Sequence, residues 1–350
     1  MSDYFAAANS AHGFVSWFDD IFAPETLGRT YILKGGSGTG KSTLMKRAAA
    51  RCEEAGGEVE RFRCSSDAAS LDGVILRLGG DSAAILDGTA PHLRDPRYPG
   101  AAEEIVHLGA FWDAGALRAH RAEIVALTKR KAALYADAYR SLAAAGLAAR
   151  EVYAAAGGCL LSEKLDAAAH RLLLQRMKSH RVKPSGAPVR RIRALSAIAT
   201  QGEVHFDGAR AGYEICLAVD AAGSAPYLFD ALLRAADALG LDYDRAPMPL
   251  LPERTEALTF PQLSLCVLSR TDAADVRPIN MTRFLDRASL PDRAHLRSLR
   301  RLEREFTDAA LAKLADVRRQ HAALEEIYIA AMDFEAMGKM TDALLARMFG

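Results

Sequence analysis

The sequence contains little cysteine and tryptophan and no long apolar segment. Its 350 residues include five cysteines and two tryptophans. Nowhere do about 18 apolar residues follow one another, which is the length that a membrane-spanning helix requires. The first residues also lack the positively charged region and the apolar stretch of a secretory signal peptide. We therefore expect a cytoplasmic protein that does not cross a membrane.

The cysteines lack the pairing that a disulfide framework or a zinc site requires. They are odd in number and widely separated in the chain, and no Cys and His ligands lie in pairs at short spacing. We expect free thiols in a reducing compartment. The cysteines are Cys52, Cys64, Cys159, Cys216 and Cys266.

An excess of charge of either sign is also absent. The 45 basic and 44 acidic residues nearly cancel, so no overall field attracts the chain to nucleic acid or to an anionic membrane. Half of the residues are hydrophobic and a quarter are charged, which is the composition of a folded globular protein. The length allows two domains, each with a core of its own.

An internal repeat divides the sequence into two halves. Three blocks of the first half recur in the same order in the second half. The matched blocks are 7–13 with 196–202, 44–61 with 228–245, and 151–165 with 326–340. We predict two copies of one unit, residues 1–183 and 184–350. They are joined near Lys183–Pro188, where two prolines and a glycine are typical of a linker.

Each half is expected to be an α/β domain with a parallel sheet covered by helices on both faces. In the first half, β-branched, aromatic and apolar runs predict strands at 30–33, 58–64 and 82–86. Apolar residues recur every four positions over 42–55, and Gly56 and Gly57 follow, which predicts a helix with a glycine stop.

Two longer helical segments are predicted, one in each half. The segment 116–181 is rich in Ala, Leu, Arg and Glu and has few helix breakers. It predicts a long helical hairpin that is broken near Gly146 or near Gly157-Gly158. The segment 291–349 is expected to be its counterpart.

A phosphate-binding loop is the strongest chemical signal. The segment Gly35-Gly36-Ser37-Gly38-Thr39-Gly40-Lys41-Ser42-Thr43 satisfies the pattern G-x-x-x-x-G-K-[ST]. Glycines let the backbone adopt positive φ and approach phosphates, so that successive N–H groups form an anion-binding nest at a helix N-terminus. Lys41 would contact the β and γ phosphates, and the Ser42 hydroxyl would ligate Mg²⁺. The loop therefore predicts binding of a nucleoside triphosphate, ATP with Mg²⁺.

A second magnesium ligand is expected at the end of another strand. Asp87 ends the run 82–87, and we predict that it binds Mg²⁺ together with Ser42. Asp67 follows the second strand and would lie at the carboxyl edge of the sheet, where such folds bind ligands. Two roles are open for Asp67: a base toward water or an acceptor hydroxyl, or an ordinary residue that closes a turn.

The sequence after Asp87 leaves both hydrolysis and phosphoryl transfer open. No Glu follows Asp87, so the acidic pair with which many motor ATPases polarise the attacking water is missing. The turn Leu86-Asp87-Gly88, with Pro91 shortly after it, resembles the corresponding strand end of adenylate-kinase-like enzymes. His92, Arg94 and Arg97 are either further contacts to substrate or γ-phosphate or ordinary polar residues of this loop.

The second half has lost the phosphate-binding loop. The segment Val219–Pro226 corresponds to Gly35–Ser42, with Ala225 in place of the lysine and Pro226 in place of the serine. Proline also removes an N–H donor, and the strand that corresponds to 82–87 ends in Ser269. We expect this half to be a structural or regulatory partner of the first half. One hypothesis is that its Arg270 or Arg277 reaches the first half as an arginine finger.

Residues Tyr4–Phe14, Leu33–Thr43 and Leu86–His92 together resemble a family of largely uncharacterised bacterial P-loop ATPases with two tandem nucleotide-binding halves. The resemblance covers most of the first half and is fainter in the second. It implies ATP binding by Lys41 and Ser42 and a repeat architecture, and it implies no known substrate.

These observations favour a duplicated P-loop NTPase fold, a three-layer α/β arrangement with long helical hairpins. The first functional hypothesis is an ATPase whose hydrolysis cycle moves the hairpins toward a protein partner. The second is a kinase that transfers the γ-phosphate to a small molecule or nucleotide. The third is a nucleotide-binding sensor with little turnover, which the missing Glu favours. A membrane or nucleic-acid partner is not indicated.

Overall fold

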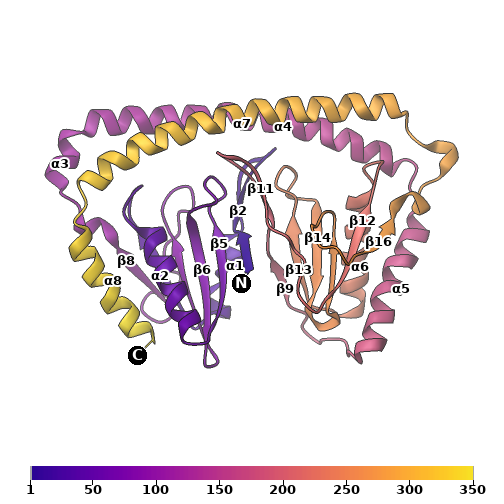
Figure 1. Ribbon diagram of the computed structural model, residues 1–350, viewed down its shortest axis with the longest axis horizontal. Helices are drawn as coiled ribbons and strands as arrows, with labels where there is room; N and C mark the ends of the chain where they lie inside the picture. Colours follow the sequence, from indigo (N-terminus) through magenta and orange to yellow (C-terminus); the bar gives the residue numbers. More distant parts are fainter. Residues whose placement is uncertain (1, 350) are drawn as a thin grey trace.

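The computed structural model describes residues 2–349 and shows a mixed α/β protein. Two six-stranded sheets lie side by side, and a pair of long helices runs across both of them (Figure 1). Most strand pairs in each sheet are parallel. The expected α/β class is therefore confirmed, with two sheets that are rich in parallel pairs.

The first sheet consists of β1 (Ser2–Phe5), β4 (Arg29–Lys34), β5 (Glu58–Arg63), β6 (Leu71–Leu78), β7 (Asp81–Asp87) and β8 (Glu103–His107). Its strand order is β1-β5-β6-β7-β4-β8. Strand β6 is antiparallel to both of its neighbours. The sheet is therefore mixed, and the prediction of a wholly parallel sheet was wrong. The sequence patterns did not identify β6, because its buried residues run without the alternation of a half-exposed strand.

The second sheet repeats the first strand for strand. It consists of β9 (Arg190–Ile192), β12 (Glu214–Val219), β13 (Tyr243–Pro247), β14 (Thr255–Phe260), β15 (Leu265–Leu268) and β16 (Arg277–Asn280). Its order is β16-β12-β15-β14-β13-β9. Strand β14 is antiparallel to both neighbours, as β6 is, and the other three pairs are parallel.

Short elements repeat as well. Helix α2 (Lys41–Glu54) follows β4, and α6 (Ala225–Leu239) follows β12. The hairpin β2 (Ala7–Ser10) and β3 (Gly13–Ser16) has its counterpart in β10 (Ser196–Ala199) and β11 (Gly202–His205). The remaining short helices are α1 (Phe18–Ile21) and α3 (Ala114–Ala119), with short 3₁₀ turns between elements.

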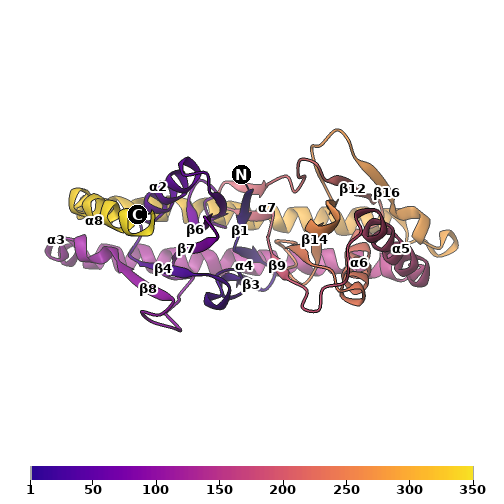
Figure 2. The same ribbon diagram turned by 90° about the horizontal axis from the view of Figure 1, so that it is seen from below.

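The long helices do not form the expected hairpins within each half. Helix α4 (Arg121–Gly157) runs antiparallel to α7 (Arg293–Ala330) over both sheets, as Figures 1 and 2 show. A helix of this length extends about 55 Å, which is more than one sheet can cover. It therefore carries the chain across to the other half, and its partner is the long helix of that half.

The helices that follow are exchanged between the halves. Helix α5 (Ser162–His180) packs on α6 of the second half, and α8 (Phe334–Phe349) packs on α2 of the first. The chain turns after Gly157, and Gly146 lies within α4. A Cβ on Gly146 would lie 2.4 Å from the Cβ of Ala11, so this glycine permits close packing and does not break the helix. Residues 1–183 thus contribute helices to both sheets.

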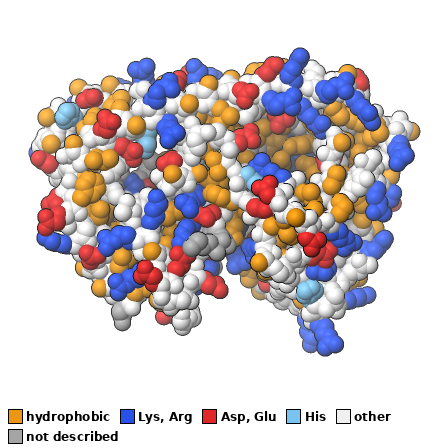
Figure 3. Space-filling model, viewed as in Figure 1, with side chains coloured by type: hydrophobic (Ala, Val, Ile, Leu, Met, Phe, Trp, Pro, Cys, Tyr) orange, Lys and Arg blue, Asp and Glu red, His pale blue; other side chains and the backbone are white. Residues whose placement is uncertain are grey.

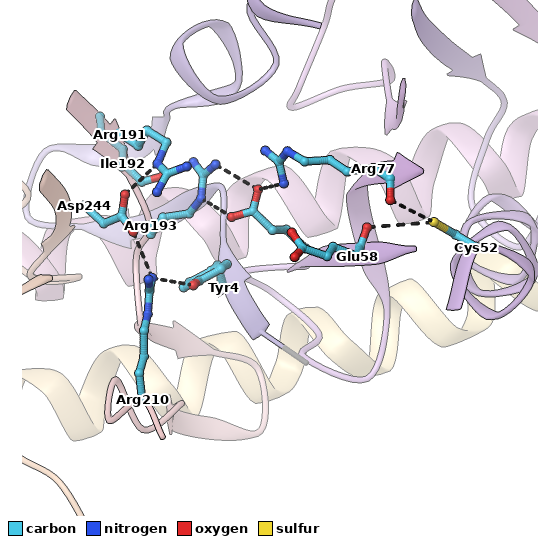
Figure 4. A network of polar contacts seen from close by, with 10 residues as sticks. Tyr4, Cys52, Glu58, Arg77, Arg191, Ile192, Arg193, Arg210 and Asp244 are labelled. Carbon is cyan, nitrogen blue, oxygen red and sulfur yellow. Dashed lines mark hydrogen bonds and ion pairs between the residues drawn. The ribbon is translucent and has the colours of Figure 1, made fainter. Parts of the chain in front are cut away.

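Two features join the two halves: a continuous hydrophobic core, and a charged seam that consists of Glu60 of the first half and Arg193 of the second half. Phe5 of β1 stacks on Phe206 of the second half with ring centroids 4.9 Å apart, within one hydrophobic cluster shared by both sheets. Arg193, which is labelled in Figure 4, donates from Nε and Nη2 to the two carboxylate oxygens of Glu60 at 2.8 and 3.0 Å. Burial raises the pKa of Glu60, but the charges and hydrogen bonds of Arg193 and Arg77 outweigh it and hold this pKa at about 2.

The nearly balanced charge of the chain conceals a local basic surface. A groove of about 520 Å³ on α7 is lined by Ala294, Arg297, Ser298, Arg300, Arg301 and Arg304. Basic side chains gather over this end of α7 in Figure 3.

Every helix within residues 2–349 is too short or too polar to span a lipid bilayer.

Candidate phosphate-binding site

The glycine-rich loop connects β4 to α2 at the carboxyl edge of the first sheet. Gly38 and Gly40 have φ of 70° and 80°, in the left-handed region that disfavours other residues. Gly40 is the N-cap of α2, so the first N–H groups of this helix point toward the loop. The backbone therefore has the shape of an anion-binding nest.

The predicted ligands Lys41, Ser42 and Asp87 are brought together at this loop. The Lys41 ammonium donates to the carbonyl oxygens of Gly35 and Gly36 at 2.7 and 2.6 Å. Its Nζ also lies 3.5 Å from Oδ2 of Asp87. The Ser42 hydroxyl accepts from the Leu71 N–H at 3.0 Å. The lysine is thus held at the loop, next to the carboxylate that ends β7.

Asp87 lies in a largely buried position. Its Oδ1 accepts from the Thr89 N–H at 2.9 Å. Burial raises the pKa of Asp87, and the charge of Asp72 adds to this rise, while Lys41 and Thr89 act in the opposite direction. A divalent cation would remove the repulsion between the two carboxylates, which is the chemistry expected of a magnesium ligand.

Helices of the second half cover the loop. A Cβ on Gly36 would lie 3.2 Å from Tyr328, and one on Gly38 would lie 2.8 Å from Ile329, both on α7. A Cβ on Gly40 would lie 2.6 Å from Met337 of α8. The glycines therefore serve close packing against these helices as well as their own backbone conformation. The loop forms a site shared by both halves.

Three of the other predicted candidates have structural roles. Asp67 accepts from the Ala69 N–H and the Ser70 hydroxyl at 3.2 and 2.9 Å, which is the turn-closing alternative. Arg94 is buried, where it donates to Glu103 and to two carbonyl oxygens. Arg97 pairs with the exposed Asp19 at 2.9 Å. None of these contacts is directed at the loop.

His92 lies beside an acidic residue that sequence reasoning missed. Its Nε2 lies 3.0 Å from Oδ2 of Asp72, and both side chains are at least nine-tenths buried. Phe18 stacks on the imidazole with centroids 4.2 Å apart. The pairing of Gly73 with Leu86 places Asp72 next to Asp87. Asp72 thus supplies a second carboxylate where no Glu follows Asp87.

No local signal marks Asp72 in the sequence. It is the second residue of the antiparallel strand β6, far from Asp87 in the chain, whereas a second acid is expected directly after Asp87. The repeat offers one clue, because Glu256 is the second residue of β14, the position that corresponds to Asp72, and is also buried. Burial raises the pKa of Glu256 to about 7.

Lys131 of α4 was also missed. Burial lowers the pKa of Lys131, the charge of Glu325 opposes this shift, and the charge of Lys41 adds to it. The neighbouring Tyr135 hydroxyl lies 2.9 Å from the Ser66 hydroxyl, in the turn after β5. Helix α4 thus contacts the turn after β5 through Tyr135.

The corresponding loop of the second half contains a carboxylate of its own. Oδ1 of Asp220 accepts from the Ala222 N–H at 3.0 Å, and Oδ2 accepts from the Ala225 N–H at 2.7 Å. Ala225 begins α6, so the N-terminus of this helix is occupied by an internal anion. This carboxylate is a further obstacle to phosphate binding, besides the loss of the lysine, the serine and the N–H group at Pro226.

The arginine-finger hypothesis finds no support in the geometry. Arg277 pairs with Glu214 at 3.1 Å, and Arg270 donates to the Ser196 hydroxyl at 2.7 Å. All four residues belong to the second half. Their contacts hold the second sheet and its hairpin together.

Neither metal clusters nor relatives identify the site independently. Within residues 2–349, no group of three or more His, Cys, Asp or Glu side chains could hold a metal ion. Comparisons with family models, curated proteins and solved structures each gave no match.

Proposed function

We propose that the chain binds a magnesium nucleoside triphosphate, ATP in the first instance, at Gly35–Thr43 and hydrolyses it. One observation carries the proposal: the Lys41 ammonium is held at the loop carbonyls, 3.5 Å from Asp87, above a helix N-terminus. A loop with this backbone and these side chains fits a polyphosphate. A purely structural turn does not require a lysine and an aspartate in largely buried positions.

The residues present also fit a magnesium ion that is held partly by phosphate. Ser42 and Asp87 would supply two oxygen ligands, and Mg²⁺ usually keeps several waters and takes its remaining ligands from phosphate oxygens. The ion would supply positive charge that neutralises the phosphate oxygens.

Side chains and backbone N–H groups of the chain would then position the phosphates and the nearby waters for hydrolysis. Lys41 would exchange its carbonyl partners for phosphate oxygens, and the loop N–H groups would hold the phosphates in place. Asp72 is fixed by His92 beside Asp87, so we assign it a positioning role toward the waters near the metal. Trp112 and Tyr328, with ring centroids 5.5 Å apart, lie against the loop and limit access of solvent.

A screen of ligands and acceptors tests the proposal. Thermal unfolding is measured with ATP, GTP and their diphosphates, with and without Mg²⁺, and phosphate release is measured with and without small hydroxyl acceptors. Hydrolysis without an acceptor supports the proposed ATPase. Acceleration by a small acceptor selects the kinase, and stabilisation without turnover selects the sensor. If no purine triphosphate stabilises the protein, the proposal is wrong.

A further inference from the structure

A cavity of about 320 Å³ lies between the two halves, beside the charged seam. Its wall contains Asp3 and Tyr4 of β1, side chains of β13 and β14, and the connection from β11 to β12. None of the lining residues belongs to Gly35–Thr43. Cavities of about 300–1,000 Å³ are typical of sites for small molecules. This cavity is therefore a candidate for a second ligand site.

The cavity lies where the first half has a short helix and the second half has none. In the first half, residues 17–28 form α1 and a 3₁₀ turn, and a Cβ on Gly73 would lie only 2.3 Å from the Phe22 ring. Ala257 corresponds to Gly73, since each is the third residue of its strand. The corresponding connection of the second half, residues 206–213, is shorter and consists of turns and irregular structure. It leaves Ala257 at the wall of the cavity.

Two arginines bind a single carboxylate at the wall of the cavity. Asp244 accepts from Arg191 at 2.6 Å and from Arg210 at 2.8 Å, as Figure 4 shows. The Asp244 side chain is buried, and both Asp244 and Arg210 line the cavity. The pairing of two guanidinium groups with one carboxylate leaves one positive charge without a counterion.

The seam repeats this arrangement in the first half. Glu60 matches Asp244 within the repeated blocks 44–61 and 228–245. It pairs with Arg193, which lines the cavity, at 2.8 Å and with Arg77 at 3.0 Å. The four arginines of the two groups therefore exceed the two carboxylates by two positive charges.

Two further acids line the cavity. Asp3 pairs with Arg63 at 2.6 Å and so adds no net charge. Asp207 accepts hydrogen bonds from the Thr271 hydroxyl and from backbone N–H groups, and its charge reduces the excess to one. Buried positive charge is unfavourable unless an anion compensates it. The charges around the cavity therefore favour an anionic ligand over a cationic one.

Polar groups at the cavity also have unused hydrogen-bonding capacity. Both side-chain hydrogen bonds of Arg210 leave from Nη2, to Asp244 and to the Tyr4 hydroxyl oxygen at 3.1 Å. Within residues 2–349, the hydrogen of the Tyr4 hydroxyl has no acceptor. Nε2 of His205, another lining residue, is buried without a partner in the same range. Arg210 and Tyr4 can therefore still donate to a carboxylate or phosphate oxygen.

We propose that this cavity binds a small organic anion, whose carboxylate or phosphate group contacts Arg210 and Tyr4 and whose carbon skeleton packs on Ala246 and Ala257. The apolar part of the wall is the reason for an organic anion and against an inorganic one. The inference goes beyond the proposed function of the phosphate-binding loop and does not depend on it. Because Tyr4 belongs to the first half and Arg210 to the second, the bound anion would stabilise the contact between the halves.

Benzoate and phenyl phosphate are the probes that test the inference, and benzamide is the neutral control of the same size as benzoate. Binding is measured by calorimetry and by thermal unfolding. We expect both anions to bind the wild type and raise its unfolding temperature, and benzamide to bind at least about tenfold more weakly, as the loss of a charge-assisted hydrogen bond implies. The tighter of the two anions shows whether the site prefers carboxylate or phosphate. Equal binding of benzamide and benzoate would overturn the inference.

Arg210→Met removes the cationic contact, and Arg277→Met is its matched control. Arg277 also pairs with a carboxylate of the second half, but it is exposed and does not line the cavity. We expect Arg210→Met to bind both anions at least about tenfold more weakly, and Arg277→Met to bind them like the wild type. Ala257→Leu fills the cavity without a change of charge and should also weaken both anions, so the test holds even if Arg210→Met does not fold.

Lys41→Ala separates this cavity from the phosphate-binding loop. We expect it to bind both anions like the wild type. Loss of anion binding in Lys41→Ala, with binding kept in Arg210→Met and Ala257→Leu, would place the anion at the loop and overturn the inference. If the wild type binds Mg-ATP but neither anion, the inference is wrong and the proposed function stands. If it binds the anions at the cavity but no nucleotide, the proposed function alone is wrong.

Discussion

The Nε2 atom of His92 lies 3.0 Å from Oδ2 of Asp72, in a position almost closed to solvent. The pair joins the loop after β7 to the start of β6. Two neighbouring strands are thereby fixed where Asp87 and the phosphate-binding loop meet. Nδ1 of His92 is buried and has no hydrogen-bond partner within residues 2–349. Such a group is costly to bury, which favours a role beyond packing.

Asp72→Asn and His92→Gln are expected to reduce turnover about 10- to 100-fold, the usual effect of removing an outer partner of a metal site. ATP affinity should change little, because the loop itself grips the phosphates. The double variant should be no slower than the slower single variant if the two residues act as one unit. Asp67→Asn is the control. Steady-state kinetics and calorimetry give the two quantities, and equal turnover in all variants would contradict the assignment.

Glu60 is expected to make the stability of the seam depend on pH. Its pKa is about 2 in the folded protein, against an ordinary value of 4.5. The stabilisation is therefore complete above about pH 4.5 and is lost as the pH falls toward 2, and it amounts to about 3 kcal/mol. Urea unfolding at pH 6 and pH 3 measures about 2 kcal/mol of it, because part of the stabilisation is still present at pH 3, above the folded pKa. Glu60→Gln should lose most of this difference, whereas Glu58→Gln, on the exposed end of β5, should keep it. An equal pH dependence in both variants would show that Arg193 does not hold the seam.

Asp220→Ala is expected to lower the free energy of unfolding by about 1–2 kcal/mol, because Ala222 and Ala225 lose their acceptor at a helix N-terminus. Asp275→Ala, in an exposed loop of the same half, should have almost no effect. Denaturant unfolding measures both. ATP affinity should not change in either variant, since this loop has no lysine. A new ATP site in Asp220→Ala would refute our account of the second loop.

The sequence indicated the parts of the site that are local in the chain. Gly35–Thr43, the strand before it and Asp87 are recognisable because the loop pattern, its flanking elements and a strand end are short-range features. Asp72 was missed for a different reason. Its position near the loop depends on strand pairing, and the contacts of α7 with the loop depend on the exchange of helices between halves, neither of which any periodicity encodes. The prediction of a helical hairpin within each half was wrong for the same reason, because the long helices pair across the two halves.

The repeat predicted which elements of the two halves correspond, but it did not predict which helices pack on which sheet. The matched blocks correspond to the hairpins β2–β3 and β10–β11 and to α2 and α6. They could not show that α8 would pack on α2, because an amphipathic helix fits either of two similar sheets. Which one it reaches is decided by the length of α7 and by the turn that follows it.

Calorimetric titration of Mg-ATP into the wild type, Lys41→Ala and Lys46→Ala tests the central claim most directly. Lys46 lies on the same helix and is exposed, so it controls for the loss of one positive charge. We predict magnesium-dependent binding by the wild type and by Lys46→Ala, and affinity at least about tenfold weaker in Lys41→Ala. Equal affinity in all three proteins, or no binding by the wild type, would contradict the phosphate-binding role of the loop.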